Sequence, residues 1–174
     1  MIPFTEVTLK VWVLVGLGIV TAVYAVEEVL RVQGRHTPLV SRFTLRMSRP
    51  SESRRFIAAP IFLSLGIMLA LSIYPRNIAY ASICVVALGD PVAGFVGRRF
   101  GHNHVGRKTL EGFVAGWIVA FLSTLIFVSA VTGVIGSMAG MLMELSGFLD
   151  DNLTLPLACG AAMFMVNVLA LTPL

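Results

Sequence analysis

Long hydrophobic runs separated by short polar stretches dominate the pattern along the chain. A helix that crosses a membrane needs about 20 mostly apolar residues. The runs at 11–30, 56–73 and 78–95 have suitable lengths. The run at 113–143 contains no charge, and at about 1.5 Å per residue it is too long for one span. We therefore expect it to break near 132–136.

After this break the pattern predicts a short fifth helix at 135–149 and a sixth at 153–174. The predicted fold class is all-α: a polytopic transmembrane bundle of about six spans, forming one integral membrane domain over 1–174. The composition agrees, with 57% hydrophobic residues, 13% charged residues and a mean hydropathy of +0.89. A soluble domain carries roughly 25% charged residues. The composition therefore excludes both a water-soluble globule and a disordered chain.

The basic residues predict the orientation. Eleven of the 13 lysines and arginines lie in two connections, at 31–55 and within 96–112, which six spans would place on the same side. Positive loops face the cytoplasm. We therefore expect both connections to be cytoplasmic, both termini to lie outside, and the chain to reside in the cell membrane.

The connection at 31–55 has an amphipathic helical pattern. Arg35, Arg42, Arg46 and Arg49 share one helix face, with apolar residues on a neighbouring face. Such a helix is typical of a segment lying on anionic lipid. The alternative is that arginines next to the second span contact nucleotide phosphates, namely Arg54 and Arg55.

Asp90 lies in a hydrophobic run and is followed at once by Pro91, so we expect the helix to kink or break there. A carboxylate inside a span is costly and usually faces a partner or a water-filled cavity. The alternative is a polar residue at the membrane interface.

The segment that follows Asp90, at 96–112, predicts a loop rich in glycine and basic residues. Glycine lets backbone N–H groups approach an anion closely, and the basic side chains add positive charge. This combination indicates phosphate binding by Gly97, Arg98, Gly101, Lys108, Thr109 and Gly112. For the glycines, the alternative is close packing of helices.

A second acidic group lies near the C-terminus, at Glu144, Asp150, Asp151 and Asn152. Hard oxygen ligands of this kind suit Mg²⁺, which bridges to substrate phosphates. The candidate metal ligands are Asp90, Glu144, Asp151 and Asn152. The alternative is a helix start, with Asn152 as N-cap and Pro156 early in the helix.

These groups together fit phosphoryl transfer, which needs a nucleotide held by cations, Mg²⁺ held by carboxylates, and a group that orients the acceptor hydroxyl. The acceptor would be a lipid alcohol entering from the bilayer. We expect nucleotide, a membrane lipid and the bilayer as partners, and no nucleic acid.

The chain resembles the CTP-dependent lipid kinases, the family that includes dolichol kinase, phytol kinase and yeast-type diacylglycerol kinase. The resemblance rests on Gly89-Asp90, Ala93, Gly97, Gly101, Lys108-Thr109-x-Glu111-Gly112 and Asp151-Asn152-Leu153-Thr154 with Pro156, together with Glu28 and Arg31. It implies an all-helical membrane fold, CTP as phosphoryl donor and a divalent cation.

The resemblance also suggests roles. Asp90 and Asp151 would hold Mg²⁺ or orient the hydroxyl, Lys108 would bind donor phosphates, and Glu111 would position Lys108. Two other functions stay open. A phosphatidate cytidylyltransferase also joins CTP to a membrane lipid, and a small ion transporter would use Asp90 and Glu144 as ion ligands.

Overall fold

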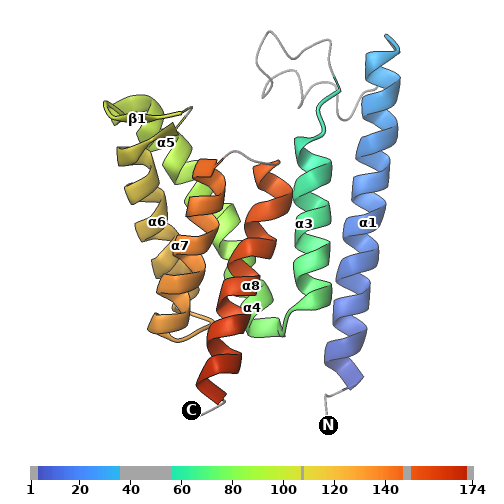
Figure 1. Ribbon diagram of the computed structural model, residues 1–174. Helices are drawn as coiled ribbons and strands as arrows, with labels where there is room; N and C mark the ends of the chain where they lie inside the picture. Colours follow the sequence, from blue (N-terminus) through green and yellow to red (C-terminus); the bar gives the residue numbers. More distant parts are fainter. Residues whose placement is uncertain (1–3, 36–55, 107, 147–149, 172–174) are drawn as a thin grey trace. The chain divides into compact units, whose positions relative to one another are not determined.

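The computed structural model describes residues 4–35, 56–106, 108–146 and 150–171, and most of them are helical (Figure 1). The all-α prediction is confirmed for these residues. The chain divides into two compact units, Met1–Ser64 and Leu65–Leu174. The single integral membrane domain over 1–174 stays a prediction.

The first unit contains α1 (Phe4–Val32) and the start of α3 (Ala59–Ile73). The buried Glu28 carboxylate accepts hydrogen bonds from the Arg31 guanidinium, at 2.6 and 2.8 Å, and from the backbone N–H of Ile57, at 2.7 Å. The Tyr24 hydroxyl donates to the carbonyl of Ile57 at 3.1 Å. These bonds join the end of α1 to the segment before α3. The candidate phosphate ligands Arg54 and Arg55, and most of the predicted amphipathic segment, lie outside the described residues.

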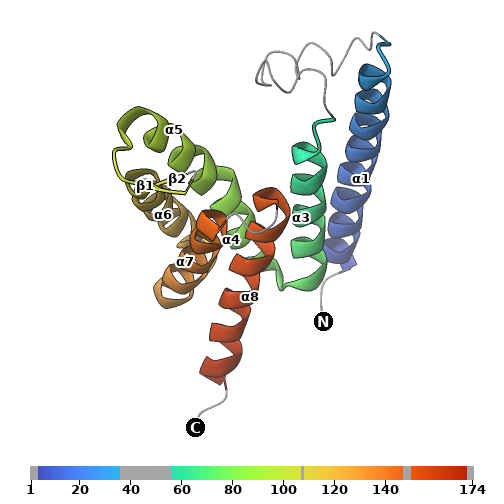
Figure 2. The same ribbon diagram turned by 45° about the horizontal axis from the view of Figure 1, so that its top comes forward.

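The second unit contains the rest of α3, followed by α4 (Arg76–Cys84), the π-helical turn η1 (Val85–Gly89), α5 (Asp90–Phe100), β1 (His104–Val105), β2 (Lys108–Thr109), α6 (Leu110–Thr124), α7 (Ala130–Ser146) and α8 (Asp151–Leu171). Helix α5 packs on α6, α7 packs on α8, and α6 also contacts η1 and α7. The antiparallel hairpin of β1 and β2 lies between the ends of α5 and α6 (Figure 2). The buried core of the second unit includes Ile78, Val85, Met141, Leu155 and Met163.

Asp90 lies inside a continuous helix, because α4, η1 and α5 follow one another without a break. We expected a kink or a break at Pro91, and the break does not occur, because the helix continues through this residue. Proline lacks an N–H and its ring collides with the carbonyl four residues earlier. The π-helical turn immediately before Asp90 widens the backbone there and accommodates the ring. The first part of the predicted loop, 96–100, is consequently helical.

The long apolar run breaks at 125–129, not near 132–136. Helix α7 begins at Ala130, and the hydroxyl oxygen of Ser129 accepts a hydrogen bond from the N–H of Thr132 at 3.4 Å. Serine is a favoured N-cap because it satisfies an unpaired N–H of the first turn. Ser129 therefore marks the helix start that the sequence analysis placed five residues later.

Three helical segments are long and apolar enough to cross a membrane: Thr8–Val32, Arg76–Phe100 and Asp151–Ala170. Three further apolar helices are shorter, Ala59–Ile73, Leu110–Thr124 and Ala130–Leu145. The prediction of about six spans is therefore not confirmed, since only three helices in the described part of the chain reach spanning length.

Candidate active site

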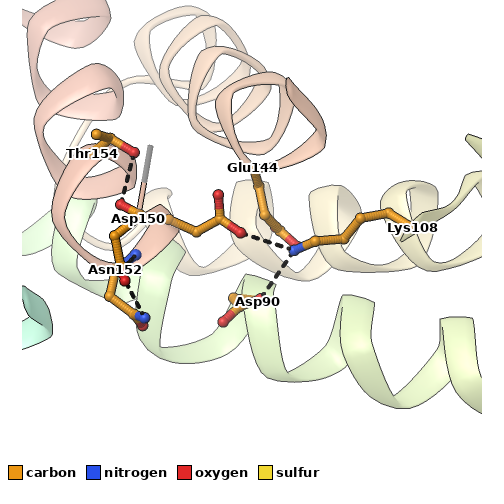
Figure 3. Close-up of polar contacts among 7 residues, drawn as sticks. Asp90, Lys108, Glu144, Asp150, Asn152 and Thr154 are labelled. Carbon is orange, nitrogen blue, oxygen red and sulfur yellow. Dashed lines mark hydrogen bonds and ion pairs between the residues drawn. The ribbon is translucent and has the colours of Figure 1, made fainter. Parts of the chain in front are cut away.

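Four charged side chains of the second unit meet at one point (Figure 3). The ammonium of Lys108 donates a hydrogen bond to the carboxylate of Glu144. The same nitrogen lies 3.4 Å from Oδ2 of Asp151 and 3.9 Å from Oδ1 of Asp90. The four residues come from β2, α7, α8 and α5, so only tertiary packing brings them together.

The hairpin that carries Lys108 is held at its base by α6. Oγ1 of Thr109 caps this helix and accepts a hydrogen bond from the N–H of Gly112 at 3.3 Å. The carboxylate of Glu111 accepts bonds from the N–H and the side-chain amide of Asn103, at 3.1 and 2.9 Å. The N–H of Leu110 donates in turn to the carbonyl of Asn103 at 2.9 Å.

Glu111 thus closes the loop that contains the hairpin. We expected it to position Lys108, and its bonds to Asn103 provide an indirect means of doing so. Asn103 is a residue that the sequence analysis missed. Its signal would have been an amide side chain in the turn between two helices, the second of which carries an acid in its first turn.

Glycines allow α5 and α6 to approach closely beside this hairpin. A Cβ atom on Gly97 would lie 2.6 Å from Oγ1 of Thr109, and one on Gly112 would lie 2.5 Å from the carbonyl oxygen of Ala93. The N–H of Gly112 already donates to Thr109, and the N–H of Gly101 donates to the carbonyl of Gly97 at 3.1 Å. In this structure the three glycines have a packing role that sets the position of Thr109, the neighbour of Lys108.

The start of α8 is capped by Asp150, not by Asn152. Oδ1 of Asp150 accepts bonds from the N–H and the side-chain amide of Asn152, both at 3.1 Å, and the carbonyl of Asp150 accepts from the hydroxyl of Thr154 at 3.1 Å. The helix-start interpretation was therefore correct for the segment and wrong for the capping residue. Asp151 lies in the first turn, where the helix dipole favours a carboxylate.

The cluster carries an excess of negative charge. Three carboxylates around one ammonium leave a formal charge of −2 when all are ionised. Glu144 is only 3% exposed, whereas Asp90 and Asp151 are 39% and 30% exposed. Among the described residues, Oε2 of Glu144 is buried and has no hydrogen-bond partner. A buried carboxylate oxygen of this kind needs a partner, because an unpaired one is costly.

Lys108 is strongly held in its charged form. Burial by itself disfavours an ammonium, but the hydrogen bond to Glu144 and the charges of Glu144, Asp151 and Asp90 outweigh it and raise the pKa of Lys108. Nearby opposite charge favours the ionised state of a base. The cluster is therefore a set of carboxylates around a charged ammonium.

The donor set fits a divalent cation in its chemistry. Magnesium prefers carboxylate oxygens at about 2.0–2.1 Å. Within the described residues, no three acidic, histidine or cysteine side chains stand at metal-ligand spacing. The carboxylates surround an ammonium instead. Their oxygens are farther apart than metal ligands would be, because N–O contacts are longer than Mg–O bonds. The excess negative charge and the unpaired Oε2 of Glu144 are the features that a cation would satisfy. Arg98 is exposed in the last turn of α5, outside the cluster.

The chain is similar to plant proteins named as kinases of isoprenoid alcohols. It is 30% identical over 133 residues to probable phytol kinase 2, chloroplastic, of Oryza sativa subsp. japonica, covering 64% of this chain and 44% of that protein. It is 29% identical over 142 residues to farnesol kinase, chloroplastic, of Arabidopsis thaliana, covering 69% and 46%. It is 30% identical over 138 residues to probable phytol kinase 3, chloroplastic, of Glycine max, covering 64% of this chain and 42% of that protein.

The matched region spans less than half the length of these curated relatives. No protein-family model matches the chain, and no solved structure matches it. The similarity supports a relation to kinases of isoprenoid alcohols. The names of these relatives mention neither CTP nor dolichol or diacylglycerol, so those parts of the expected resemblance stay predictions.

Proposed function

We propose that this chain is a membrane-embedded lipid-alcohol kinase that transfers a phosphoryl group from CTP, or another nucleoside triphosphate, to an isoprenoid alcohol such as phytol or farnesol. Polyprenol and diacylglycerol are further acceptors to test. The observation that carries the proposal is the convergence of Asp90, Lys108, Glu144 and Asp151 on one point. The similarity to phytol and farnesol kinases supports the reaction class.

The proposed reaction uses the four side chains in different ways. The acceptor hydroxyl oxygen attacks the γ-phosphorus, the bond from that phosphorus to the β,γ-bridging oxygen breaks, and the nucleoside diphosphate leaves. Asp90 is the most exposed of the three carboxylates and would orient the hydroxyl and take its proton. Lys108 would neutralise charge on the donor phosphates, as cations do in phosphoryl transfer.

Glu144 and Asp151 would hold the divalent cation, with Asn152 beside them in the first turn of α8. When bound, such a cation supplies charge neutralisation on the phosphate oxygens. Arg98, and Arg54 and Arg55 outside the described residues, are further candidates for phosphate binding.

Exposed apolar side chains on the helix that carries Asp90 suit contact with lipid. Leu88 and Phe95 are exposed on this continuous helix, two residues before and five residues after Asp90, on the face opposite the carboxylate. The predicted cytoplasmic orientation would give the same site access to nucleotide.

The test is a phosphorylation assay on purified protein in detergent or nanodiscs. The reaction contains Mg²⁺, one of the four nucleoside triphosphates, and farnesol, phytol, a polyprenol or diacylglycerol, with the lipid product identified by mass. We expect a lipid monophosphate and one nucleoside diphosphate per turnover. Release of pyrophosphate with a CDP-lipid product would identify a cytidylyltransferase instead, and absence of any phosphorylated lipid would contradict the kinase proposal.

The variant Asp90→Asn tests the role of the carboxylate, and we expect at least a hundredfold loss in kcat, the scale of general-base contributions. Asp150→Asn is the matched control. It makes the same chemical change near the cluster, and asparagine is as good an N-cap as aspartate. Full activity of Asp90→Asn would remove Asp90 from the mechanism.

A further inference from the structure

The ammonium of Lys108 lies where the three carboxylates of the cluster converge. Glu144 accepts its hydrogen bond, and Asp151 and Asp90 lie within 3.4 and 3.9 Å of the same nitrogen (Figure 3). An oxygen of Glu144 nevertheless stays unpaired among the described residues, and the formal charge of the cluster stays negative. The ammonium of Lys108 therefore neutralises only part of the negative charge of the three carboxylates.

We propose that Lys108 is a built-in counter-ion that fills the cation position of the cluster and is displaced from it when a divalent cation binds. This inference rests on the proposed function, because it concerns the same cluster. Two positive ions about 4 Å apart repel each other strongly away from bulk water. A divalent cation bound to Glu144 and Asp151 therefore excludes the ammonium from the space between them.

The lysine is the part of the cluster that is able to move. Asp90, Glu144 and Asp151 are carried by α5, α7 and α8, whose positions are set by helix packing. Lys108 lies instead on a two-residue strand next to an exposed turn, and its side chain is a flexible four-carbon stem. The ammonium has three N–H donors, and once displaced it becomes free to bind a phosphate oxygen. Cation binding would thus convert Lys108 from a counter-ion of the carboxylates into a phosphate ligand.

The first test measures binding of Mn²⁺ to the full chain in detergent by electron paramagnetic resonance, without nucleotide or lipid. Lys108→Met removes the competing ammonium, and we expect its Mn²⁺ affinity to rise at least about tenfold over the wild type. Lys10→Met is the matched control, since the chain has two lysines and Lys10 lies in α1. Unchanged or weaker Mn²⁺ binding by Lys108→Met would overturn the proposal.

The second test uses the wild-type protein and does not depend on a folded variant. A brief pulse of an amine-acetylating reagent is applied with and without Mg²⁺ at constant ionic strength, and acetylation of each lysine is quantified by mass spectrometry. We expect Mg²⁺ to raise the acetylation of Lys108 several-fold and to leave Lys10 unchanged. Equal or lower acetylation of Lys108 would mean that the ammonium stays in place, and would contradict displacement even if Lys108→Met binds Mn²⁺ more tightly.

These readouts separate the two proposals. If Mg²⁺ displaces Lys108 but the protein phosphorylates no lipid, the result supports the cation site and contradicts the kinase proposal. If the protein is an active kinase but Mg²⁺ does not change the acetylation of Lys108, the result supports the kinase proposal and contradicts the counter-ion role.

Discussion

Substitution of Gly97 by alanine should destabilise the contact between α5 and α6 that supports the active-site hairpin. The new Cβ atom would lie 2.6 Å from Oγ1 of Thr109, well inside ordinary contact. Overpacking of this kind costs about 1–3 kcal/mol, and pushing Oγ1 aside also weakens the cap on Gly112, at about 1 kcal/mol. Alanine regains up to about 1 kcal/mol of helix propensity. We therefore expect a net loss of about 1–3 kcal/mol in the free energy of unfolding.

Gly94 provides a matched control on the same helix. Within 4 Å, a Cβ atom there would meet one side-chain atom of the described residues, in the guanidinium of Arg98 at an ordinary 3.5 Å. Gly94→Ala should therefore leave stability unchanged or raise it by up to about 1 kcal/mol. Thermal unfolding in detergent measures both variants, and each 1 kcal/mol shifts Tm by about 2–4 °C for a chain of this length. The Gly97 variant should also lose the proposed kinase activity, because Thr109 adjoins Lys108.

A double-mutant cycle identifies the responsible atom. Thr109→Ala removes the oxygen that the new methyl group meets, so the cost of Gly97→Ala should largely disappear in that background. The reasoning is refuted if Gly97→Ala is as stable as Gly94→Ala, or if its cost is the same with and without Thr109.

Further substitutions test three other sets of contacts. Asp150→Ala should cost about 0.5–2 kcal/mol through loss of the α8 cap, whereas Asp150→Asn should cost little, and equal Tm values for the two would contradict the cap. Glu111→Gln should raise the KM for nucleotide and lower kcat several-fold by loosening the loop at Asn103, with Asn103→Ala giving the same pattern; a double variant whose effects simply add would argue against their coupling. Glu28→Ala removes the buried carboxylate that Arg31 and the N–H of Ile57 contact, and it should cost about 3–5 kcal/mol. Wild-type thermal stability of that variant would argue against a stabilising role of these contacts.

Local pattern predicted the helices well and their ends less well. Hydrophobic length located the helical segments of the described residues, because burial of apolar side chains governs where helices form. The end of an element depends on a few atoms. The hydroxyl of Ser129 sets the start of α7, and a π-helical turn lets the helix continue through Pro91. The general rule about proline predicts a collision between its ring and the carbonyl four residues earlier. It does not predict that a π-helical turn forms there and the helix continues.

The candidate site was only partly predictable. Asp90, Lys108, Glu144 and Asp151 were each recognisable as costly or chemically active residues. Nothing in their spacing showed that all three carboxylates face one ammonium. Glu111 and Asn103 illustrate the same limit, since a loop-closing hydrogen bond depends on the path of the loop.

The sequence by itself determined that this is an apolar, helical chain with scarce charges grouped in a few segments, because composition and periodicity act locally along the chain. Only the tertiary structure decided which charges share a site and which glycines serve packing. Those outcomes depend on how α5, α6, α7 and α8 pack, and the close approach at Gly97 and Gly112 is part of what brings Lys108 to its carboxylates.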